Sequence, residues 1–161
     1  MTHRNPVVAL VTSERDLADV VNLRTRVYVI EQGFGAHTGL TDEKDPVSYN
    51  LIARCDTVDA SGSPIATGVP VGAVRLYPYE PNVAKLERLV VLSEARGLRI
   101  GSLLVTALEE YAAKELGMNA VMLEAIADKR AFYEKLEYAV EEDVVFIKEG
   151  VDHYTMWKRG L

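Results

Sequence analysis

The apolar residues in the first half of the chain gather in short runs, which is typical of β-strands. The runs that predict strands are Val7–Val11, Tyr49–Arg54, Val71–Tyr77 and Lys85–Val91. The stretch Asp56–Pro70 is rich in glycine and proline, so it predicts a long turn between the second and third of these strands.

Between the first two strands the apolar spacing changes to that of an amphipathic helix over Glu14–Ile30. Ser13 precedes this helix as a predicted N-cap, with Asp16 at the capping-box position. The next stretch, Glu31–Pro46, is rich in glycine, threonine and acidic residues. It predicts a functional loop or a short irregular helix.

The clearest periodicity begins at Ile100, where apolar residues recur at helical spacing as far as Ala112, and Gly117 predicts the end of this helix. The elements predicted after it are a buried strand, a short helix and two strands: Ala120–Ala125, Ala127–Leu136, Val144–Lys148 and His153–Lys158. Strands dominate the first half and βαβ units the second. This order predicts one domain, residues 1–161, with a mixed sheet and helices on its faces.

The bulk composition narrows the class of protein. A chain of 161 residues with 48% hydrophobic residues can form a sizeable core, which excludes intrinsic disorder. It contains no run of about 18 apolar residues and no N-terminal signal-peptide core, so we expect neither a membrane span nor secretion. The single cysteine, Cys55, excludes an internal disulfide and fits the reducing cytoplasm. Its strand-like surroundings predict a buried core thiol rather than a catalytic one.

The formal net charge is −6 and the chain has no basic stripe, which argues against a nucleic-acid-binding surface. An acidic protein suits a cationic partner such as an amine. The three histidines, His3, His37 and His153, have no metal-ligand spacing, so we expect no metal site.

The loop Arg96-Gly97-Leu98-Arg99-Ile100-Gly101 stands where an apolar strand turns into the long helix. Backbone N–H groups at such a helix start form a nest that can bind pyrophosphate, and the two arginines add positive charge. Most turns of this composition only reverse the chain. The glycine and lysine spacing of a Walker loop or a dinucleotide fingerprint is missing.

The segment Leu89–Leu104 resembles the acetyl-coenzyme A motif of the GNAT superfamily, Arg/Gln-x-x-Gly-x-Gly/Ala, here at Arg96, Arg99 and Gly101. The segment Phe132–Tyr138 resembles its second signature, aromatic-Tyr-x-x-Leu-Gly-Phe. The order and separation also match, over about the second half of the chain. The resemblance implies an α/β fold of the GNAT type, a mixed α+β architecture with a twisted, mostly antiparallel sheet of six to seven strands and about four flanking helices.

Two residues depart from these motifs. Arg99 replaces the first glycine of the acetyl-coenzyme A motif, and Glu137 replaces the glycine after the leucine of the second. An arginine with positive φ would be strained, so we expect a helical turn at Arg99 and an added phosphate contact. Ile126 stands where the family often has asparagine.

Shorter segments resemble the ElaA-like branch of the family. Val27–Gln32 matches its aromatic-x-x-Glu-Gln segment, and Asp42 and Asp45 resemble the acidic cluster that follows. Glu149–Met156 matches its Gly-x-x-His-x-x-Met ending.

The resemblance implies that the chain uses acetyl-coenzyme A (acetyl-CoA). Two strands, over Lys85–Val91 and Ala120–Ala125, would part to admit the pantetheine arm, and N–H groups over Leu98–Ser102 would take the pyrophosphate. The residues that would bind the cofactor are Leu89, Val90, Val91, Arg96, Gly97, Leu98, Arg99, Ile100, Gly101, Ser102 and Phe132.

Tyr133 is the candidate general acid, because a phenol of pKa about 10 keeps a proton that it can give to a leaving thiolate. Without the family pattern it would be a core tyrosine. An alkylammonium must also lose a proton before it attacks, so a base or a water relay is needed. Glu87 is the catalytic candidate for this role, although it could simply be an exposed partner of Arg88, and Glu31 and His153 are alternatives.

Glu31 ends a predicted helix, where the macrodipole disfavours a carboxylate, so it is a candidate for binding the substrate amine. Gln32, Asp42 and His153 complete the predicted substrate-binding set, and His37 and Asp45 lie in the same acidic loop as Asp42. A solvated acidic loop and a structural histidine are the plainer interpretations.

The sequence therefore predicts an N-acetyltransferase that moves the acetyl group of acetyl-CoA to a primary amine of a small molecule. Amino sugars, polyamines and amino acids are all open as acceptors, and the acidic loop favours a cationic one. A protein N-terminus or lysine is the alternative within the enzyme class. A degenerate domain that only senses the carrier is the alternative outside it. Homodimers are common in this superfamily.

Overall fold

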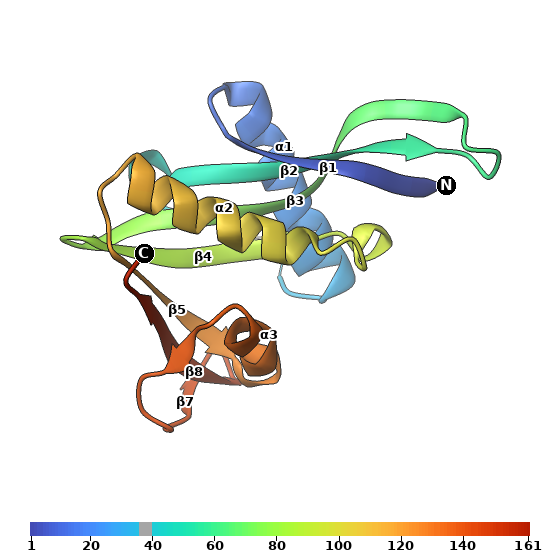
Figure 1. Ribbon diagram of the computed structural model, residues 1–161. Coiled ribbons are helices and arrows are strands. Elements are labelled where there is room, and N and C mark those ends of the chain that lie inside the picture. The colour runs from blue at the N-terminus through green and yellow to red at the C-terminus, as the bar shows by residue number, and fades with distance from the viewer. Residues whose placement is uncertain (36–39) are drawn as a thin grey trace.

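The computed structural model describes residues 1–35 and 40–161, and these residues form one mixed sheet between helices (Figure 1). Within them the sheet has eight strands, in the order β1-β2-β3-β4-β5-β8-β6, with β7 paired to β8. Their bounds are β1 Thr2–Leu10, β2 Tyr49–Val58, β3 Pro64–Glu80, β4 Val83–Val91, β5 Ala120–Ile126, β6 Ala139–Val140, β7 Phe146–Lys148 and β8 Val151–Arg159. Among the described strands, only β4 and β5 pair in parallel. The predicted mixed, mostly antiparallel sheet is confirmed, and the two-residue β6 is the strand that the sequence pattern did not predict.

The helices are α1 (Glu14–Arg24), a π-helix (Thr25–Glu31) that continues it, α2 (Ile100–Lys114) and α3 (Arg130–Lys135). Short 3₁₀ turns lie at Asp45–Val47, Ser93–Ala95 and Ala127–Lys129. The single α-helix predicted over residues 14–30 is therefore wrong in its last turns, which widen to π geometry. No helix in the described parts of the chain is long and apolar enough to cross a membrane.

The predicted N-cap of α1 is confirmed. The Ser13 hydroxyl accepts a hydrogen bond from the backbone N–H of Asp16 at 3.1 Å. This contact satisfies one of the N–H groups that every helix start leaves without an intrahelical partner.

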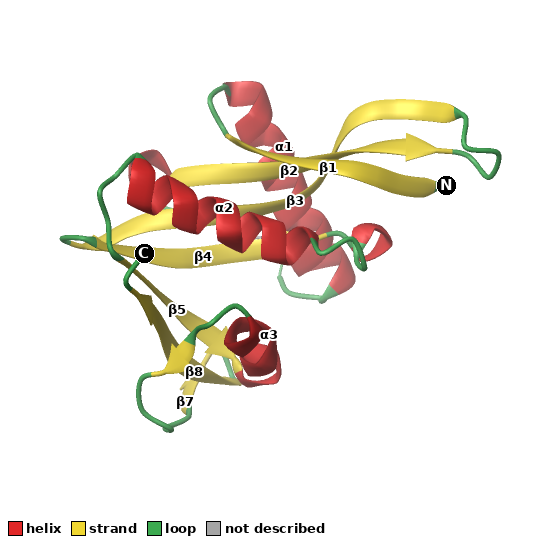
Figure 2. Ribbon diagram, in the orientation of Figure 1, coloured by secondary structure: helices red, strands yellow, loops and turns green. Residues whose placement is uncertain are grey.

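Helices cover both faces of the sheet, with α2 on the near face and α1 behind it (Figure 2). Successive side chains of β2 point to opposite faces of the sheet, so they pack into two separate parts of the core. Leu51 and Ala53 pack into the cluster under α2, while Ile52 between them packs into the cluster under α1. Cys55 is 1% exposed in the cluster under α2, so the prediction of a core thiol is confirmed.

Helix α2 lies unusually close to β3. A Cβ atom on Gly72 would stand 2.9 Å from the Val90 carbonyl oxygen and 3.1 Å from Leu104 Cδ1. No other residue type fits there without moving backbone, so this glycine sets how tightly α2 approaches the sheet.

The predicted long turn over Asp56–Pro70 is wrong. Strands β2 and β3 run through most of it, and a tight turn in which the Asp59 carboxylate accepts from the N–H groups of Ser61 and Ser63 joins them. The β2–β3 register shifts near Ala53 and Arg54, opposite Pro70. These bulges let the strand tolerate proline and glycine, which the sequence pattern read as chain breakers.

Glu137 ends α3 in a Schellman motif. The N–H of Tyr138 bonds the Tyr133 carbonyl, the N–H of Glu137 bonds the Glu134 carbonyl, and Glu137 has φ 72°. The Tyr133 and Tyr138 rings pack edge to face at 5.9 Å, which is the apolar contact that usually accompanies this motif. The glycine of the family signature is thus replaced without a change of backbone shape.

Replacing Glu137 with glycine should stabilise the protein by about 1 kcal/mol, because glycine adopts positive φ without the Cβ strain. The melting temperature should then rise by about 2–4 °C in a chain of this size. Thermal and urea unfolding of Glu137→Gly measure this. Glu137→Ala is the matched control, since it removes the carboxylate but keeps the Cβ, and it should show no gain. An equal gain in both variants would assign the effect to charge and refute the backbone argument.

Candidate active site

Strands β4 and β5 part in the middle of the sheet. They pair only over Val83–Leu86 and Ala120–Leu123. Beyond Leu86, β4 continues to pair with β3, and β5 continues to pair with β8. One edge of β4 therefore presents backbone N–H and C=O groups that no strand takes up, at the place where the family resemblance implies an opening for the pantetheine arm.

A β-bulge marks the point of parting. Ala73 pairs with Val90 and Arg75 pairs with Glu87, so β4 holds one residue more than β3 across this interval. Arg88 lies in the extra stretch and has φ 55°. Bulges increase local twist and redirect neighbouring side chains, and this one lies immediately before the backbone of Leu89.

The loop before α2 has the geometry of an anion site. Helix α2 begins at Ile100, Arg99 is its N-cap without a side-chain capping bond, and its first turn contains no acidic residue. The N–H groups of Ile100, Gly101 and Ser102 are therefore left to a ligand or to water, at the positive end of the helix dipole.

The predicted helical turn at Arg99 is wrong. This residue is left-handed, with φ 58° and ψ 29°. The neighbouring Gly97 also has positive φ, 98°. Tertiary packing of the loop overrides the preference of arginine, so the chain keeps the backbone that a glycine at position 99 would adopt.

The two signature segments are in contact. A Cβ atom on Gly101 would stand 3.2 Å from Cζ of Phe132, so the ring of Phe132 lies against the first turn of α2. Leu98 packs on the edge of the core under α2, and Ile100 is 2% exposed within it. A side chain at position 101 would require the Phe132 ring to move by a few tenths of an ångström.

Arg96 and Glu31 tie the loop to the π-helix. The Arg96 guanidinium forms an ion pair with the Glu31 carboxylate at 2.5 Å and donates a hydrogen bond to the Val91 carbonyl at 3.1 Å. The Glu31 and Arg96 side chains keep 31% and 50% of their exposure. Each of these two predicted site residues therefore has a protein partner that a ligand would have to share or replace.

Tyr133 lies beside the opening and is 8% exposed. Its ring packs edge to face against Phe132 at 5.0 Å. Burial raises the pKa of the Tyr133 hydroxyl, and the nearby Tyr28 hydroxyl adds to the rise. Tyr133 belongs to the core under α2, whereas Tyr28 packs on the core under α1.

Glu87 is held by cations rather than exposed. Its Oε1 accepts a hydrogen bond from Arg75 Nη2 at 3.1 Å, and its Oε2 lies 3.8 Å from the Nζ atoms of Lys44 and Lys85. The distance to the lysines exceeds a hydrogen bond, so Oε2 forms ion pairs with them without accepting a hydrogen bond from either.

The acidic loop is neutralised by arginines. Asp42 accepts hydrogen bonds from Arg75 at 2.7 and 3.1 Å and from Arg88 at 3.1 Å, and Asp45 pairs with Arg24 and Arg75 at 3.2 Å. Burial alone would raise the pKa of Asp42, but the hydrogen bonds from Arg75 and Arg88 outweigh it and lower this pKa below its usual range. Neither carboxylate is free for a cationic acceptor.

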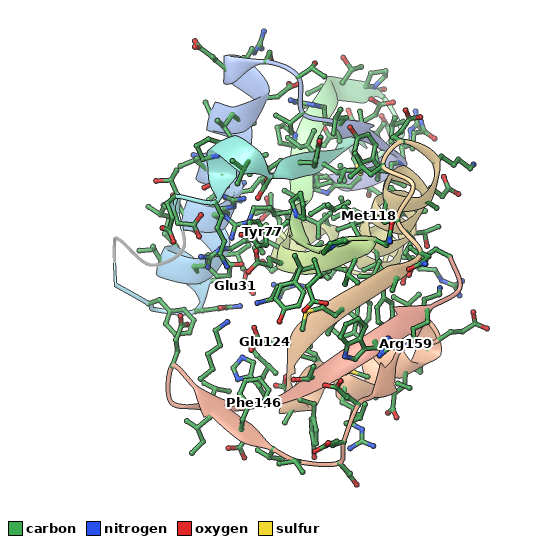
Figure 3. All side chains as sticks on the ribbon, turned by 90° about the vertical axis from the view of Figure 1, so that its left-hand side faces the viewer. Glu31, Tyr77, Met118, Glu124, Phe146 and Arg159 are labelled. Atoms are coloured by element: carbon green, nitrogen blue, oxygen red, sulfur yellow. The ribbon has the colours of Figure 1, made fainter. Side chains whose placement is uncertain are left out.

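The remaining predicted substrate residues border the same region. His153 on β8 is 9% exposed, its Nδ1 lies 2.8 Å from the Val151 carbonyl oxygen, and its ring stacks on Phe146 at 5.6 Å. Gln32 is the exposed cap residue of the π-helix, and His37 lies outside the described residues. Figure 3 shows Glu31 and Tyr77 with the upper elements and Glu124 and Phe146 on the strands below.

Sequence reasoning missed the cations of this region, namely Arg24, Arg75, Arg88 and Lys85, and the carboxylate Glu124, which pairs with Lys85 at 2.6 Å. One feature of the sequence could have indicated these ion pairs. Arg75 interrupts the apolar run of β3 and is 1% exposed. An arginine within a buried strand needs a buried partner, which predicts an ion pair but does not say which carboxylates supply it.

Comparison with known proteins identifies the family. The model of the Acetyltransferase (GNAT) family matches residues 32–138. The Bacillus subtilis (strain 168) protein named "Putative acetyltransferase BSU40680" is 33% identical over 152 residues, which cover 94% of this chain and 95% of that protein.

Solved structures share the fold. Escherichia coli ElaA superposes with a TM-score of 0.76 at 18% identity, over 96% of this chain and 100% of that one. An aminoglycoside 6'-N-acetyltransferase complexed with coenzyme A superposes with a TM-score of 0.65 at 20% identity, over 95% and 96%. The chain therefore belongs to the GNAT family of acetyltransferases, which use acetyl-CoA.

Proposed function

We propose that this protein transfers the acetyl group of acetyl-CoA directly to a primary amine of a small molecule. The observation that carries the proposal is the parting of β4 and β5 beside Tyr133, a buried tyrosine whose pKa is raised, with the Glu87 carboxylate on the same stretch of β4. Acetyl transfer from a thioester to an amine requires a general acid and a base, and Tyr133 and Glu87 would supply them.

The described residues fit acetyl-CoA. N–H groups over Leu98–Ser102 would bind its pyrophosphate, with Gly97 shaping the turn and Arg96 and Arg99 adding charge. Among the described residues, no strand pairs with the β5 side of β4 over Leu89–Val91, where the Val91 carbonyl accepts from Arg96. This edge would hold the pantetheine arm, and Phe132 would pack beside it. Bound acetyl-CoA supplies the acetyl group as a thioester.

Two side chains would move protons. Tyr133 holds a proton on its hydroxyl oxygen that it can give to the leaving sulfur, and burial keeps that proton in place at neutral pH. Glu87 Oε2 can take a proton from the acceptor ammonium, directly or through water, while Arg75 holds Oε1. The acetyl carbonyl would be polarised by backbone N–H groups of β4.

We place the acceptor on the face of the sheet that α1 covers, bordered by Glu31, Gln32, Asp42 and His153. Polar side chains from the acidic loop, β3, β4 and β5 converge there on a small area, which is how sites for small molecules are built. The aminoglycoside acetyltransferase of the same fold also supports a small-molecule acceptor. A peptide N-terminus or lysine is the alternative acceptor, so peptides belong in the test.

Replacing Tyr133 with phenylalanine should lower kcat about a hundredfold or more, because the leaving sulfur loses its proton donor. Thiol release from acetyl-CoA, measured with amino sugars, amino acids, polyamines and peptides as acceptors, tests the proposed function and this variant together. Binding of acetyl-CoA should be unchanged. Absence of turnover with every acceptor would refute the proposed function.

Tyr138→Phe is the matched control for this experiment. Tyr138 lies five residues from Tyr133, and its hydroxyl donates to Glu109 on α2 at 2.8 Å. This variant should lose stability but keep kcat. An equal loss of kcat in both variants would assign the effect of Tyr133→Phe to folding rather than to proton transfer.

The alkaline side of the pH profile should be flat to beyond about pH 10. A tyrosine whose pKa is raised keeps its proton above the ordinary value near 10, so the acid form of Tyr133 stays available. The measurement is kcat against pH at saturating substrates. A loss of kcat between about pH 8 and 9 would show that a different group donates the proton.

Replacing Arg99 with glutamine should weaken acetyl-CoA binding about three- to tenfold, through the loss of one charge beside the phosphates. Calorimetric titration measures the affinity, and the salt dependence should also decrease. Arg15→Gln on α1 makes the same change in net charge at an exposed position remote from the loop and should leave the affinity unchanged. Equal affinities of the Arg99 variant and the unmodified protein would exclude a phosphate contact.

A further inference from the structure

Ion pairs connect ten side chains around Glu87 into one cluster, here called the acceptor-face network. Within the described residues, its carboxylates are Asp42, Asp45, Glu87 and Glu124, and its cations are Arg24, Lys44, Arg75, Lys85, Arg88 and Lys148. Four carboxylates face six cations. The network therefore carries an excess of two positive charges, although the chain as a whole has a net charge of −6.

Three of the six cations are the most exposed members of the network, while the side chains of Arg24, Arg75 and Lys85 are 11% exposed or less. Lys148, Lys44 and Arg88 keep 46%, 33% and 28% of their side-chain exposure, whereas none of the four carboxylates exceeds 22%. A ligand that approaches from solvent therefore meets cations first. The local field opposes the one that the overall composition suggests.

These outer cations have unused bonding capacity. Lys44 Nζ lies 3.8 Å from its carboxylate partner and 4.7 Å from the centroid of the Tyr77 ring. Lys148 shares Glu124 with Lys85, which is the nearer partner at 2.6 Å against 3.3 Å. An ammonium group has three donors, so each lysine can still bind an anion.

The network lies on the face of the sheet away from α2. Along β3 and β4, Arg75 and Glu87 alternate with Val74, Leu76 and Leu86, which pack into the core under α2. The loop proposed for the carrier pyrophosphate starts α2 on that other face. The outer cations are thus placed for the acceptor rather than for the phosphates of the carrier.

We propose that the acceptor of this enzyme carries an anionic group, a carboxylate or a phosphate, in addition to its amine. Lys44, Arg88 and Lys148 bind the anion, and the amine reaches Glu87 Oε2. This inference rests on the proposed function and narrows its acceptor class. Amino acids and phosphorylated amino sugars fit it, whereas polyamines meet repulsion from the outer cations.

Matched pairs of amines test the proposal. Glucosamine 6-phosphate is compared with glucosamine, and 4-aminobutyrate with its amide, with spermidine as a polycation. The anionic member of at least one pair should have a kcat/KM about tenfold higher or more, and added salt should reduce this preference. The pair that shows the preference identifies the anion as phosphate or carboxylate. Equal values within both pairs, or a preference for spermidine, would overturn the proposal.

Substitutions of the outer lysines test which residues cause the preference for anionic acceptors. Lys44→Gln and Lys148→Gln should each reduce it several-fold and leave the KM for acetyl-CoA unchanged. Lys114→Gln, an exposed change at the end of α2, is the matched control and should preserve it. An unchanged preference in both network variants would remove the network from acceptor recognition.

Binding separates this proposal from the proposed function. Calorimetry with the coenzyme A-loaded protein should show tighter binding of the anionic member of a pair. Tighter binding without acetylation of any amine would support the anion site and refute the transferase. Acetylation with no difference in binding or kcat/KM within the pairs would support the transferase and refute the anion site.

Discussion

The guanidinium of Arg75 is the constraint on which the site depends. It is 1% exposed in a central strand, and a buried charge is very costly unless it is paired. Its partners Asp42, Asp45 and Glu87 come from the loop before β2 and from the neighbouring strand β4. The loop must therefore return to the sheet, and the Glu87 carboxylate is oriented by the same contact.

The features that sequence predicted best are local ones. The turn before α2, the apolar stripe of α2 and the short helix that carries Tyr133 each depend on residues close together in the chain, so their spacing was visible. The ion pairs could not be predicted from residue spacing. Arg75 lies 30 and 33 residues from Asp45 and Asp42, and no periodicity specifies a contact over such a distance. The sequence could show that Arg75 needed a partner but not that three carboxylates would share it.

Arg99 and Glu137 show a different reason why prediction from the sequence can fail. Each stands where the family motif has glycine, and each adopts the positive φ of that glycine. Residue preference argued for a helical turn at Arg99, but the contacts of the surrounding loop and of Phe132 with Gly101 fix the backbone regardless. The motif is thus kept as a shape of the main chain rather than as a set of residue types. Neither departure gives a structural reason to regard the domain as degenerate.

The π-helix that follows α1 determines where two of its side chains point. Its wide turns bond Gln32 N–H to the Val27 carbonyl, so the side chains after Arg24 leave the angular register of α1. Val27 stays in the core, Tyr28 packs against that core, and Glu31 reaches Arg96 in the loop before α2. Gain or loss of a single residue in this segment would re-aim those two side chains without disturbing the packing of α1. Relatives that differ there by one position can thus place these two side chains differently while β4 and β5 stay the same.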